Sequence, residues 1–477
     1  MSGPRKVAVI GAGPAGITAA YQLSKNKDIE VELYEAASSV GGLAKSIELW
    51  NQKVDIGPHR FFSSDRDVNS LWLEVVGEEY KMVDRLTRIL YSNKFFYYPL
   101  KPFDALLNLG VFEAFRCMWS FGFQRFKKKP DQRTFEGWVI GRFGRRLFEI
   151  FFKTYSEKLW GIKCSELDAD FAAQRIKKLS LLEVVKNALH LTKKGEHKTL
   201  VDQFAYPLRG TGMVYENMKE RILANGGKVF LGSPVKKVLT TDKTATGIEL
   251  ESGEIKNFDE VVSSMPLTLL VERLSDAPKN IVEHVSKLTY RNTIMVYLQV
   301  DAIDLFPDNW LYIHSENLQV GRITNFRNWV PQLYGNEKKT ILAMEYWCYE
   351  QDDFWSWSEE KIIELAKAEI KMTNLIGKAE IEGGKIVRIP RCYPVYSMGY
   401  KEDLKPVEEY LTGIKALSVI GRYGAFKYNN QDHSILMGMR AAENITEGKD
   451  HDLWDINTDY DNYQESYIIT STGLEKS

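Results

Sequence analysis

The amino-acid sequence predicts an α/β fold with a Rossmann-type domain, and three stretches of the chain support this prediction. The first is a short apolar run at residues 7–10, which ends in glycines and precedes an Ala-rich stretch that begins near Pro14. The second is a strand-like run at residues 30–35 that ends in an acid. The third, at residues 259–266, is a buried-strand pattern closed by small residues and a proline. Buried strands that alternate with helices predict a parallel sheet.

The turn after the first strand carries a glycine motif that is typical of dinucleotide-binding sites. Gly11, Gly13 and Gly16 stand in the order GxGxxG. Gly11 permits the tight turn, Gly13 lets the backbone approach a pyrophosphate, and Gly16 lets the helix pack on the strand. The helix that begins at Pro14 and Ala15 is expected to point its free N–H groups and positive end at the same place. An ordinary glycine turn in an α/β fold is the alternative interpretation.

The next residues indicate which dinucleotide is bound. Glu35 ends the second strand about twenty residues past the glycines, where an acid is expected to bind a ribose hydroxyl. A glycine doublet follows, in the order Gly41-Gly42-Leu43-Ala44-Lys45. This order resembles the second signature of a large FAD family that contains amine oxidases, protoporphyrinogen oxidase, phytoene desaturase and UDP-galactopyranose mutase. The resemblance implies tightly bound FAD instead of exchangeable NAD, with Gly42, Leu43 and Ala44 near the flavin end and Lys45 near the phosphates.

Composition and charge exclude several classes of protein. The chain has 477 residues, enough for two to three domains, and its 63 Lys and Arg against 64 Asp and Glu give a formal charge of −1. We therefore expect no attraction of the whole protein to nucleic acid or to an anionic membrane. The four cysteines are far apart without metal-ligand spacing, so no metal site or disulfide framework is expected. A polar start and the lack of an apolar run of about 18 residues predict a cytoplasmic protein without a transmembrane segment.

The FAD-binding domain is predicted to be discontinuous, because its strands lie far apart in the sequence. The predicted boundaries are residues 1–63, 206–270 and 410–447 for the FAD-binding domain, 64–205 for a mainly helical substrate domain, 271–409 for an antiparallel-sheet substrate domain, and 448–477 for a polar surface tail. A β-like stretch at residues 89–100, with Asn93-Lys94 as its turn, interrupts the helical part. In the FAD family a strand at the corresponding position makes a backbone contact with the adenine. The resemblance implies the same contact for Val235.

The segment from Phe103 to Phe126 is amphipathic, rich in Leu, Phe and Trp, and ends in Lys127-Lys128-Lys129. We expect a buried helical part of the substrate domain with a solvated basic end. The alternative is a peripheral contact with a membrane surface that helps to admit a lipid substrate.

His59 follows a Gly-Pro pair in a short irregular loop at residues 54–62. A single histidine is most often a solvated or capping residue. UDP-galactopyranose mutases have a similar Gly-Pro-His or Gly-Gly-His at this point, which implies a place for His59 beside the reactive edge of the flavin. An imidazole there could hydrogen-bond the flavin or exchange protons near neutral pH.

Two further segments resemble the parts of these mutases that grip a nucleotide diphosphate. The first has a similar Tyr-x-x-Lys-x-Trp, at Tyr155 and Trp160, and then Arg175, whose fork could bind phosphate oxygens in a bidentate way. The second, residues 310–331, predicts a hairpin that places Tyr312 and Arg322 on neighbouring strands. Eukaryotic-type mutases have a similar Trp-Leu-Tyr with an Arg ten residues past the Tyr, and both residues clamp the diphosphate. Surface side chains are the alternative in each case.

The last landmark is the stretch from Ala416 to Gly438, where a buried strand ends in Gly421-Arg422, a loop carries Tyr428, and a helix opens. The positive end of that helix would point at the flavin pyrimidine, where reduction builds negative charge. The likeness to eukaryotic mutases is closest here. It implies that Arg422 lies against flavin and sugar and Tyr428 against the diphosphate. Three further cofactor-binding residues are predicted at the start of the helix: Asp432, His433 and Ser434.

The resemblance to UDP-galactopyranose mutase covers essentially the whole chain. It implies that the enzyme interconverts pyranose and furanose forms of a nucleotide diphosphate sugar, with N5 of reduced FAD as the nucleophile and NAD(P)H as a candidate reductant. The catalytic residues would be His59, Arg175, Arg322 and Arg422. Three arginines in one pocket would be costly around an apolar substrate, whereas a diphosphate would neutralise them.

Two departures from the mutase pattern leave the nucleotide and the sugar open. Leu100-Lys-Pro-Phe103 stands where the mutases often have amides, and Arg60 follows the histidine where an apolar residue is usual. Another nucleotide sugar, or a lipid-linked one, would fit. The competing hypothesis is an FAD-dependent oxidase or desaturase, which takes hydride from a C–N or C–C bond, because one fold supports many reactions. A non-catalytic FAD-bearing scaffold is a third interpretation.

Overall fold

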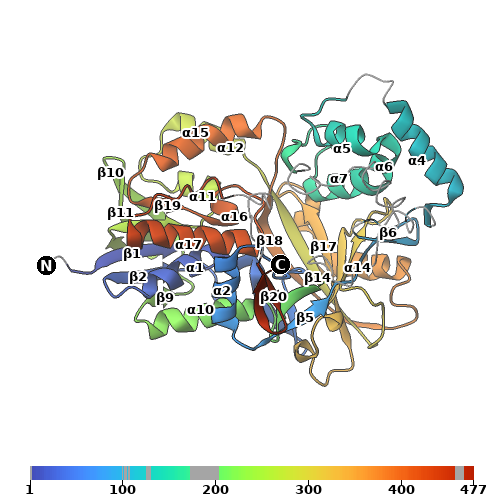
Figure 1. Cartoon of the computed structure of the whole chain (residues 1–477), viewed down its shortest axis with the longest axis horizontal. Helices are drawn as coiled ribbons and strands as arrows, with labels where there is room; N and C mark the ends of the chain where they lie inside the picture. The colour runs from blue at the N-terminus through green and yellow to red at the C-terminus, as the bar shows by residue number, and fades with distance from the viewer. Residues whose placement is uncertain are drawn as a thin grey trace.

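The computed structural model describes residues 3–98, 100, 105, 108–124, 130–171, 203–456 and 467–476. One half of the molecule is built on a five-stranded sheet in the order β19-β13-β1-β2-β9 (Figure 1). Its strands are β1 (Arg5–Ile10), β2 (Ile29–Tyr34), β9 (Lys228–Phe230), β13 (Glu260–Ser263) and β19 (Leu417–Val419). Every neighbouring pair is parallel, which confirms the predicted Rossmann-like sheet. The strands come from three separate parts of the chain.

Two helices of this half lie side by side and begin at the same edge of the sheet. α1 (Pro14–Ser24) follows β1, and α17 (Gln431–Glu447) follows β19 after a short connection. Gly438 permits their close approach, because a Cβ atom there would lie 2.4 Å from the carbonyl oxygen of Ala15. The carboxyl ends of parallel strands meet at one edge, so the N-termini of both helices face the same space.

The other half contains a seven-stranded sheet in the order β18-β14-β17-β16-β15-β6-β7. Its strands are β6 (Thr87–Tyr91), β7 (Lys94–Tyr97), β14 (Tyr290–Val300), β15 (Trp310–Ile313), β16 (Arg322–Asn325), β17 (Thr340–Cys348) and β18 (Ile381–Pro394). The predicted hairpin is confirmed, since Tyr312 and Arg322 are directly opposed across β15 and β16. The central strands β14 and β17 are buried on both faces.

The sheet predicted for residues 271–409 is mainly antiparallel, as expected, but it also contains two strands from outside that range. β6 and β7, which lie in the segment predicted to be mainly helical, extend this sheet, and β6 pairs with β15 in parallel. The β-like stretch was predicted, but its turn was expected at Asn93-Lys94. The structure has the turn one residue earlier, at Ser92 and Asn93, which are both left-handed. Its pairing partner, more than 200 residues further along the chain, is set by tertiary packing and leaves no local signal.

A group of helices lies beyond β6 and β7, at the margin of the molecule (Figure 1). It comprises α4 (Val111–Gln124), α5 (Phe135–Phe143), α6 (Arg145–Phe148) and α7 (Thr154–Trp160), with a π-helical turn at Glu149–Lys153. The interpretation of the amphipathic segment as a buried helix is wrong for α4. Only Ala114 and Cys117 of this helix are buried, and its large apolar side chains are exposed.

The remaining described elements complete the two halves. They are α2 (Arg66–Val76), α10 (Gly212–Ala224), α11 (Leu267–Glu272), α12 (Lys279–Ser286), α13 (Asp353–Ser356), α14 (Glu359–Met372), α15 (Tyr400–Thr412), α16 (Gly421–Gly424), β3 (Ser46–Leu49), β4 (Gln52–Asp55), β5 (Tyr80–Asp84), β8 (Gln203–Pro207), β10 (Val235–Thr241), β11 (Thr244–Leu250) and β12 (Ile255–Asn257). Of the helices that the structure describes, none combines the length and apolar character required to cross a bilayer.

The C-terminal segment, expected to be an irregular surface tail, includes a hairpin. β20 (Tyr467–Thr470) pairs with β21 (Gly473–Lys476), and Tyr80 donates a hydrogen bond to the carbonyl oxygen of Thr470 at 2.7 Å. Ile469 is buried in the core of the parallel-sheet half. One apolar pair in a polar stretch is too short a pattern to predict such docking.

Candidate functional site

A cavity of about 440 Å³ lies between the two halves, at the edge where α1 and α17 begin. Most of the residues predicted from the sequence to form a site line this cavity. They are Gly13, Pro14, Ala15, Gly42, Leu43, Ala44, His59, Tyr155, Tyr312, Arg322, Gly421, Arg422, Tyr428, Asp432 and Ser434. Arg175 lies outside the described residues.

Two glycine turns form one wall of the cavity. Gly11 has a left-handed backbone with φ of +90°, and a Cβ atom on Gly16 would lie 1.9 Å from the carbonyl oxygen of Gly11. The helix can therefore approach the strand only because both residues are glycine. Gly42 packs on Gly13, where a Cβ atom would come within 3.0 Å of the Gly13 Cα. A Cβ atom on Gly13 itself would meet no described atom within 4 Å, so this turn is open on the cavity side.

The start of α17 forms the wall next to these turns. Asn430, Asp432 and Ser434 line the cavity, and burial raises the pKa of Asp432 above its ordinary value. His433, predicted to bind the cofactor, does not line the cavity, and its Nδ1 accepts a hydrogen bond from the backbone N–H of Asn430 at 3.1 Å, which caps the helix. First-turn residues of both helices line the cavity, Ala15 of α1 and Asp432 of α17 among them, so the positive ends of both helices face it.

Four other predicted cofactor residues do not line the cavity: Gly11, Gly16, Lys45 and Val235. Glu35 does not line it either, and its carboxylate accepts hydrogen bonds from the backbone N–H groups of Ala12 at 2.6 Å and Ala37 at 2.8 Å. The carbonyl oxygen of Val235 accepts a hydrogen bond from Arg273. The roles predicted for these residues stay predictions.

His59 is held on the cavity wall by its backbone. Its carbonyl oxygen accepts hydrogen bonds from Thr211 Oγ1 at 3.1 Å and from Gln431 Nε2 at 3.3 Å, which ties the loop to the start of α17. Burial, and then the positive charges of Arg322 and Arg422, lower the pKa of His59 to about 3. Its Nδ1 is buried and has no hydrogen-bond partner among the described residues. A neutral imidazole with a free ring nitrogen is therefore available to a ligand.

Arg322 forms a buried ion pair that the sequence analysis missed. Its guanidinium contacts Glu345 in a bidentate way, with Nε–Oε1 at 2.6 Å and Nη2–Oε2 at 2.5 Å. The two residues are directly opposed on β16 and β17, and the Glu345 side chain is only 2% exposed. A signal was present in the sequence, because Glu345 is the one acid in the apolar run 340–348 and a buried acid needs a partner.

Arg422 is placed differently, although it lines the same cavity. Its Nε and Nη1 donate to the carbonyl oxygens of Cys392 at 3.0 Å and Asn429 at 2.9 Å. The guanidinium also lies over the rings of Tyr393 and Tyr428, 4.8 and 4.3 Å from their centroids. No carboxylate among the described residues forms an ion pair with it. Arg422 is thus a partly buried cation held by neutral groups.

An aromatic wall supports these arginines. Tyr393, absent from the predicted site list, lines the cavity and stacks on Tyr428 with ring centroids 5.5 Å apart. Trp160, predicted to bind substrate, does not line the cavity and is fully buried behind this pair, 5.8 Å from the Tyr428 ring. The Tyr-x-x-Lys-x-Trp pattern therefore includes one cavity residue, Tyr155, and one core residue.

His314 is a second cavity residue that the sequence analysis missed. It lies two residues past Tyr312 on the same hairpin, and its ring stacks on that of Tyr155 with centroids 5.0 Å apart. The side chain is buried and its Nδ1 has no partner among the described residues. Burial, and then the charge of Lys158, lower the pKa of His314 to about 3. A second neutral imidazole therefore borders the cavity.

The buried His314 is expected to make the protein less stable at acid pH. In the unfolded chain this histidine binds a proton below about pH 6.5, whereas in the folded protein it stays neutral down to about pH 3. Because the unfolded state binds more protons between these two pH values, a fall in pH through this range favours unfolding. The free energy of unfolding falls by about 2 kcal/mol between about pH 7.5 and about pH 5. Urea unfolding at both pH values should show a smaller loss in His314→Asn than in the wild type. An equal loss in the two proteins would contradict a neutral buried His314.

The parallel sheet, the open glycine turn and the paired helix N-termini define a dinucleotide-binding protein of Rossmann-like architecture. Residues 14–388 match the family model described as flavin containing amine oxidoreductase. This is more than half of the 477 residues, so the chain belongs to that family. Membership implies FAD as the cofactor and an enzyme of the amine oxidase superfamily.

Curated relatives match parts of the chain. A probable UDP-galactopyranose mutase of Klebsiella pneumoniae is 26% identical over 177 residues, which are 35% of this chain and 43% of that protein. An FAD-dependent monooxygenase of Strobilurus tenacellus is 45% identical over 42 residues, 9% of each protein. The chain thus matches less than half the length of either relative.

Solved structures match the fold over nearly the whole chain. A reduced UDP-galactopyranose mutase has a TM-score of 0.81 at 22% identity and covers 94% of this chain and 95% of its own. A putative protoporphyrinogen oxidase from Exiguobacterium has a TM-score of 0.72 at 17% identity, over 94% and 100%. A putrescine oxidase bound to putrescine has a TM-score of 0.64 at 16% identity, over 93% and 99%. At such identities the likeness shows a shared fold.

Proposed function

We propose that the protein is a flavoenzyme that interconverts the ring forms of a sugar joined to a nucleotide diphosphate, as a UDP-galactopyranose mutase does. The charge of the cavity carries this proposal. Four arginines line it, and Asp432 is the one acid among its described lining residues; the arginines are Arg60, Arg85, Arg322 and Arg422. Even with Arg322 paired to Glu345, the positive charge of the cavity lining favours an anionic ligand and disfavours a cationic amine.

The residues at the edge of the parallel sheet fit FAD. Gly13 is open to the cavity, and a Cβ atom there would occupy the space that a pyrophosphate needs. Gly42, Leu43 and Ala44 border the same space, and the N-termini of α1 and α17 offer free N–H groups and positive dipole ends to phosphate and to a reduced ring system. When bound in its reduced form, the flavin would supply a nucleophilic nitrogen.

The residues of the opposite wall would hold the substrate. Arg422 can pair with a diphosphate through the N–H groups that its two backbone contacts leave unused. Tyr312 and Tyr428 also line the cavity and can offer hydroxyl groups to the substrate, and Glu345 fixes the orientation of Arg322. The neutral His59 can donate or accept a hydrogen bond without adding charge next to the arginines. These groups would position the leaving diphosphate and stabilise its charge.

The experiment that tests the proposal is product analysis with purified yellow protein. It is incubated with UDP-galactopyranose and other nucleotide sugars, with and without dithionite, and the products are separated by chromatography. Furanose formed only with reduced flavin supports the proposal and identifies the sugar. The absence of any ring isomer across the panel, with reduced flavin verified by absorbance, contradicts it.

Arg422→Met is expected to weaken binding of UDP at least tenfold, because a charge-assisted contact contributes about 1.5–3 kcal/mol. UDP affinity is measured by titration calorimetry on protein of equal flavin content. Arg209→Met is the matched control, since this exposed arginine forms a surface ion pair with Glu79 away from the cavity. Equal UDP affinity of Arg422→Met and the control would contradict an anion contact at Arg422.

An oxidase is the second candidate. Apolar rings and aliphatic side chains, Ile89, Leu100, Phe135, Phe151 and Phe152, line the part of the cavity next to the helices. A substrate with an apolar body and carboxylate groups would also match such a wall opposite arginines. This candidate predicts that the substrate itself bleaches the oxidised flavin without air, a result that the mutase proposal does not predict.

A further inference from the structure

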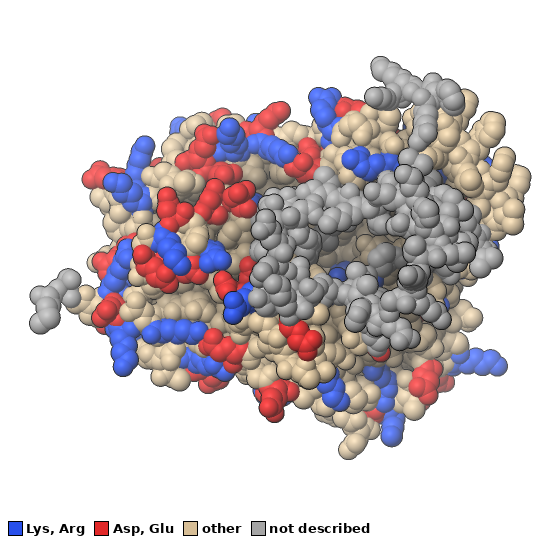
Figure 2. Space-filling view, viewed as in Figure 1, with Lys and Arg blue, Asp and Glu red and all other residues tan. Residues whose placement is uncertain are grey.

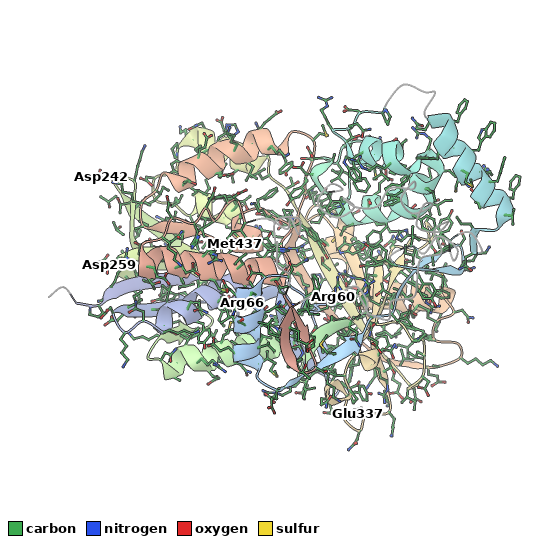
Figure 3. All side chains as sticks on the ribbon, in the orientation of Figure 1. Arg60, Arg66, Asp242, Asp259, Glu337 and Met437 are labelled. Carbon is green, nitrogen blue, oxygen red and sulfur yellow. The ribbon has the colours of Figure 1, made fainter. Side chains whose placement is uncertain are left out.

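The helix α4 turns its large apolar side chains away from the protein. Of the fourteen large apolar side chains that are exposed in the described residues, six lie on this helix, with exposed fractions from 49% to 89%. They are Val111, Phe112, Phe115, Met118, Trp119 and Phe123, and we refer to them as the α4 apolar face. Their spacing by three and four residues places them along one side of the helix. Figure 3 shows ring side chains on this helix pointing away from the molecule.

The inner side of α4 explains why the helix holds this orientation. Ala114 and Cys117 are buried, and Cys117 packs in a cluster with Ile89, Phe96 and Phe151. Small residues on that side let the helix lie close to β6 and β7 while its large residues have no place in the core. Single exposed apolar residues are normal on a protein surface, whereas a continuous row of four aromatic rings on one helix marks an interaction site.

The charge around this face differs from that of the whole protein. Residues 105–129 contain one acid, Glu113, and five cations, which gives 5 − 1 = +4 where the whole chain is −1; the cations are Arg116, Arg125, Lys127, Lys128 and Lys129. Glu113 is turned inward and pairs with Arg146 and Arg116. Arg125 and the lysines follow Gln124, the last residue of α4, within five positions of the sequence and lie outside the described residues.

Charge also discriminates between the partners that could cover the α4 apolar face. A second copy of the chain would bring two segments of charge +4 together, which disfavours self-association. Figure 2 shows mostly uncharged side chains at the margin where Figure 1 places α4. Phe and Trp on one side of a helix with Lys and Arg beside them is the composition of helices that lie in the interface of an anionic membrane.

We propose that the α4 apolar face docks the protein on an anionic lipid surface. The aromatic side chains would enter the boundary between headgroups and acyl chains. The net charge of +4 in residues 105–129 favours an anionic surface over a neutral one. Phe151 and Ile89 pack beneath α4 and also line the cavity, so the cavity would lie about one helix diameter, roughly 10 Å, from the lipid surface. This inference does not depend on the reaction that the cavity supports.

Vesicle sedimentation with the flavin-loaded protein tests the proposal. Vesicles of phosphatidylcholine alone and of phosphatidylcholine with phosphatidylglycerol are compared at low and high salt. We expect binding to the mixed vesicles that is at least tenfold stronger than to phosphatidylcholine alone and that weakens with salt. Phe115→Glu/Trp119→Glu should lower binding to the mixed vesicles at least tenfold.

Ile255→Glu/Met372→Glu is the matched control, because it adds the same charge at two exposed apolar positions away from α4. It should bind the mixed vesicles as the wild type does, and all three proteins should have equal flavin content and thermal midpoints. No binding of the wild type, or equal loss in both variants, would overturn the proposal. A wild-type dimer in light scattering that Phe115→Glu/Trp119→Glu dissociates would also overturn it and assign the face to a second copy.

Discussion

Arg322→Met is expected to lower the free energy of unfolding by about 3–5 kcal/mol, because it leaves Glu345 as an unpaired buried charge. The carboxylate is 2% exposed, and its two short contacts with Arg322 supply its charge partner. Both residues lie on central strands of the seven-stranded sheet, where the register of β16 and β17 fixes them opposite each other. Such a loss is large against the total stability of a typical protein.

A double-mutant cycle measured by urea unfolding checks this expectation. Glu345→Gln removes the charge, so Arg322→Met/Glu345→Gln should be more stable than Arg322→Met alone, with a coupling of about 2 kcal/mol or more. Arg88 and Asp308 form a second bidentate pair in the same half, and Arg88→Met provides a comparison outside the cavity wall formed by Arg322. If the loss of unfolding free energy in the double variant equals the sum of the losses in Arg322→Met and Glu345→Gln, each measured alone, the pair is not coupled.

Gly16→Ala is expected to abolish flavin binding and to destabilise the parallel-sheet half. Its Cβ would lie 1.9 Å from the carbonyl oxygen of Gly11 and 3.0 Å from Ser264 Oγ, so α1 must move away from β1. Overpacking of this kind costs about 1–3 kcal/mol. Movement of α1 also displaces the free N–H groups that face the cavity. The ratio of flavin to protein absorbance in purified protein should fall at least tenfold.

Gly13→Ala distinguishes an effect on cofactor binding from an effect on folding at the same turn. A Cβ atom on Gly13 meets no described atom within 4 Å, and this residue has an ordinary φ of −69°, so the flavin-free variant should unfold at the same temperature as the flavin-free wild type. It should nevertheless bind FAD at least tenfold more weakly, because the added methyl occupies the space opposite the pyrophosphate. Wild-type flavin content in both variants would contradict a cofactor site at this turn.

Local signals explain why much of the parallel-sheet half could be predicted. The change from an apolar strand to glycines and then to a helix occurs within residues 7–24, and neighbouring residues alone determine it. The β15–β16 hairpin was predictable for the same reason, since a short connection fixes which residues face each other. These two local patterns place Gly13, Tyr312 and Arg322 on the cavity wall.

The features that were not predicted correctly share a different cause, because each depends on contacts between residues far apart in the sequence. Glu345 is opposite Arg322 only through the register of β16 and β17, and His314 borders the cavity only because Tyr155 comes from another element. Trp160 follows the pattern of a binding residue but is covered by Tyr428 and Tyr393. For α4 the amphipathic pattern gave the helix and its two sides, but which side faces solvent depends on the β6–β7 pair beneath it.

The order of strands in the parallel sheet also has a consequence for protein synthesis. β1 is the central strand, and its neighbour β13 ends at Ser263, which is 253 residues after Ile10. At about 5–20 residues per second, the ribosome needs roughly 10–50 s to deliver that neighbour. During this interval the apolar β1 has one open edge on which another nascent chain could pair. β1 thus leaves the ribosome long before it can pair on both sides, and a newly made chain depends on protection of this strand until translation has passed β13.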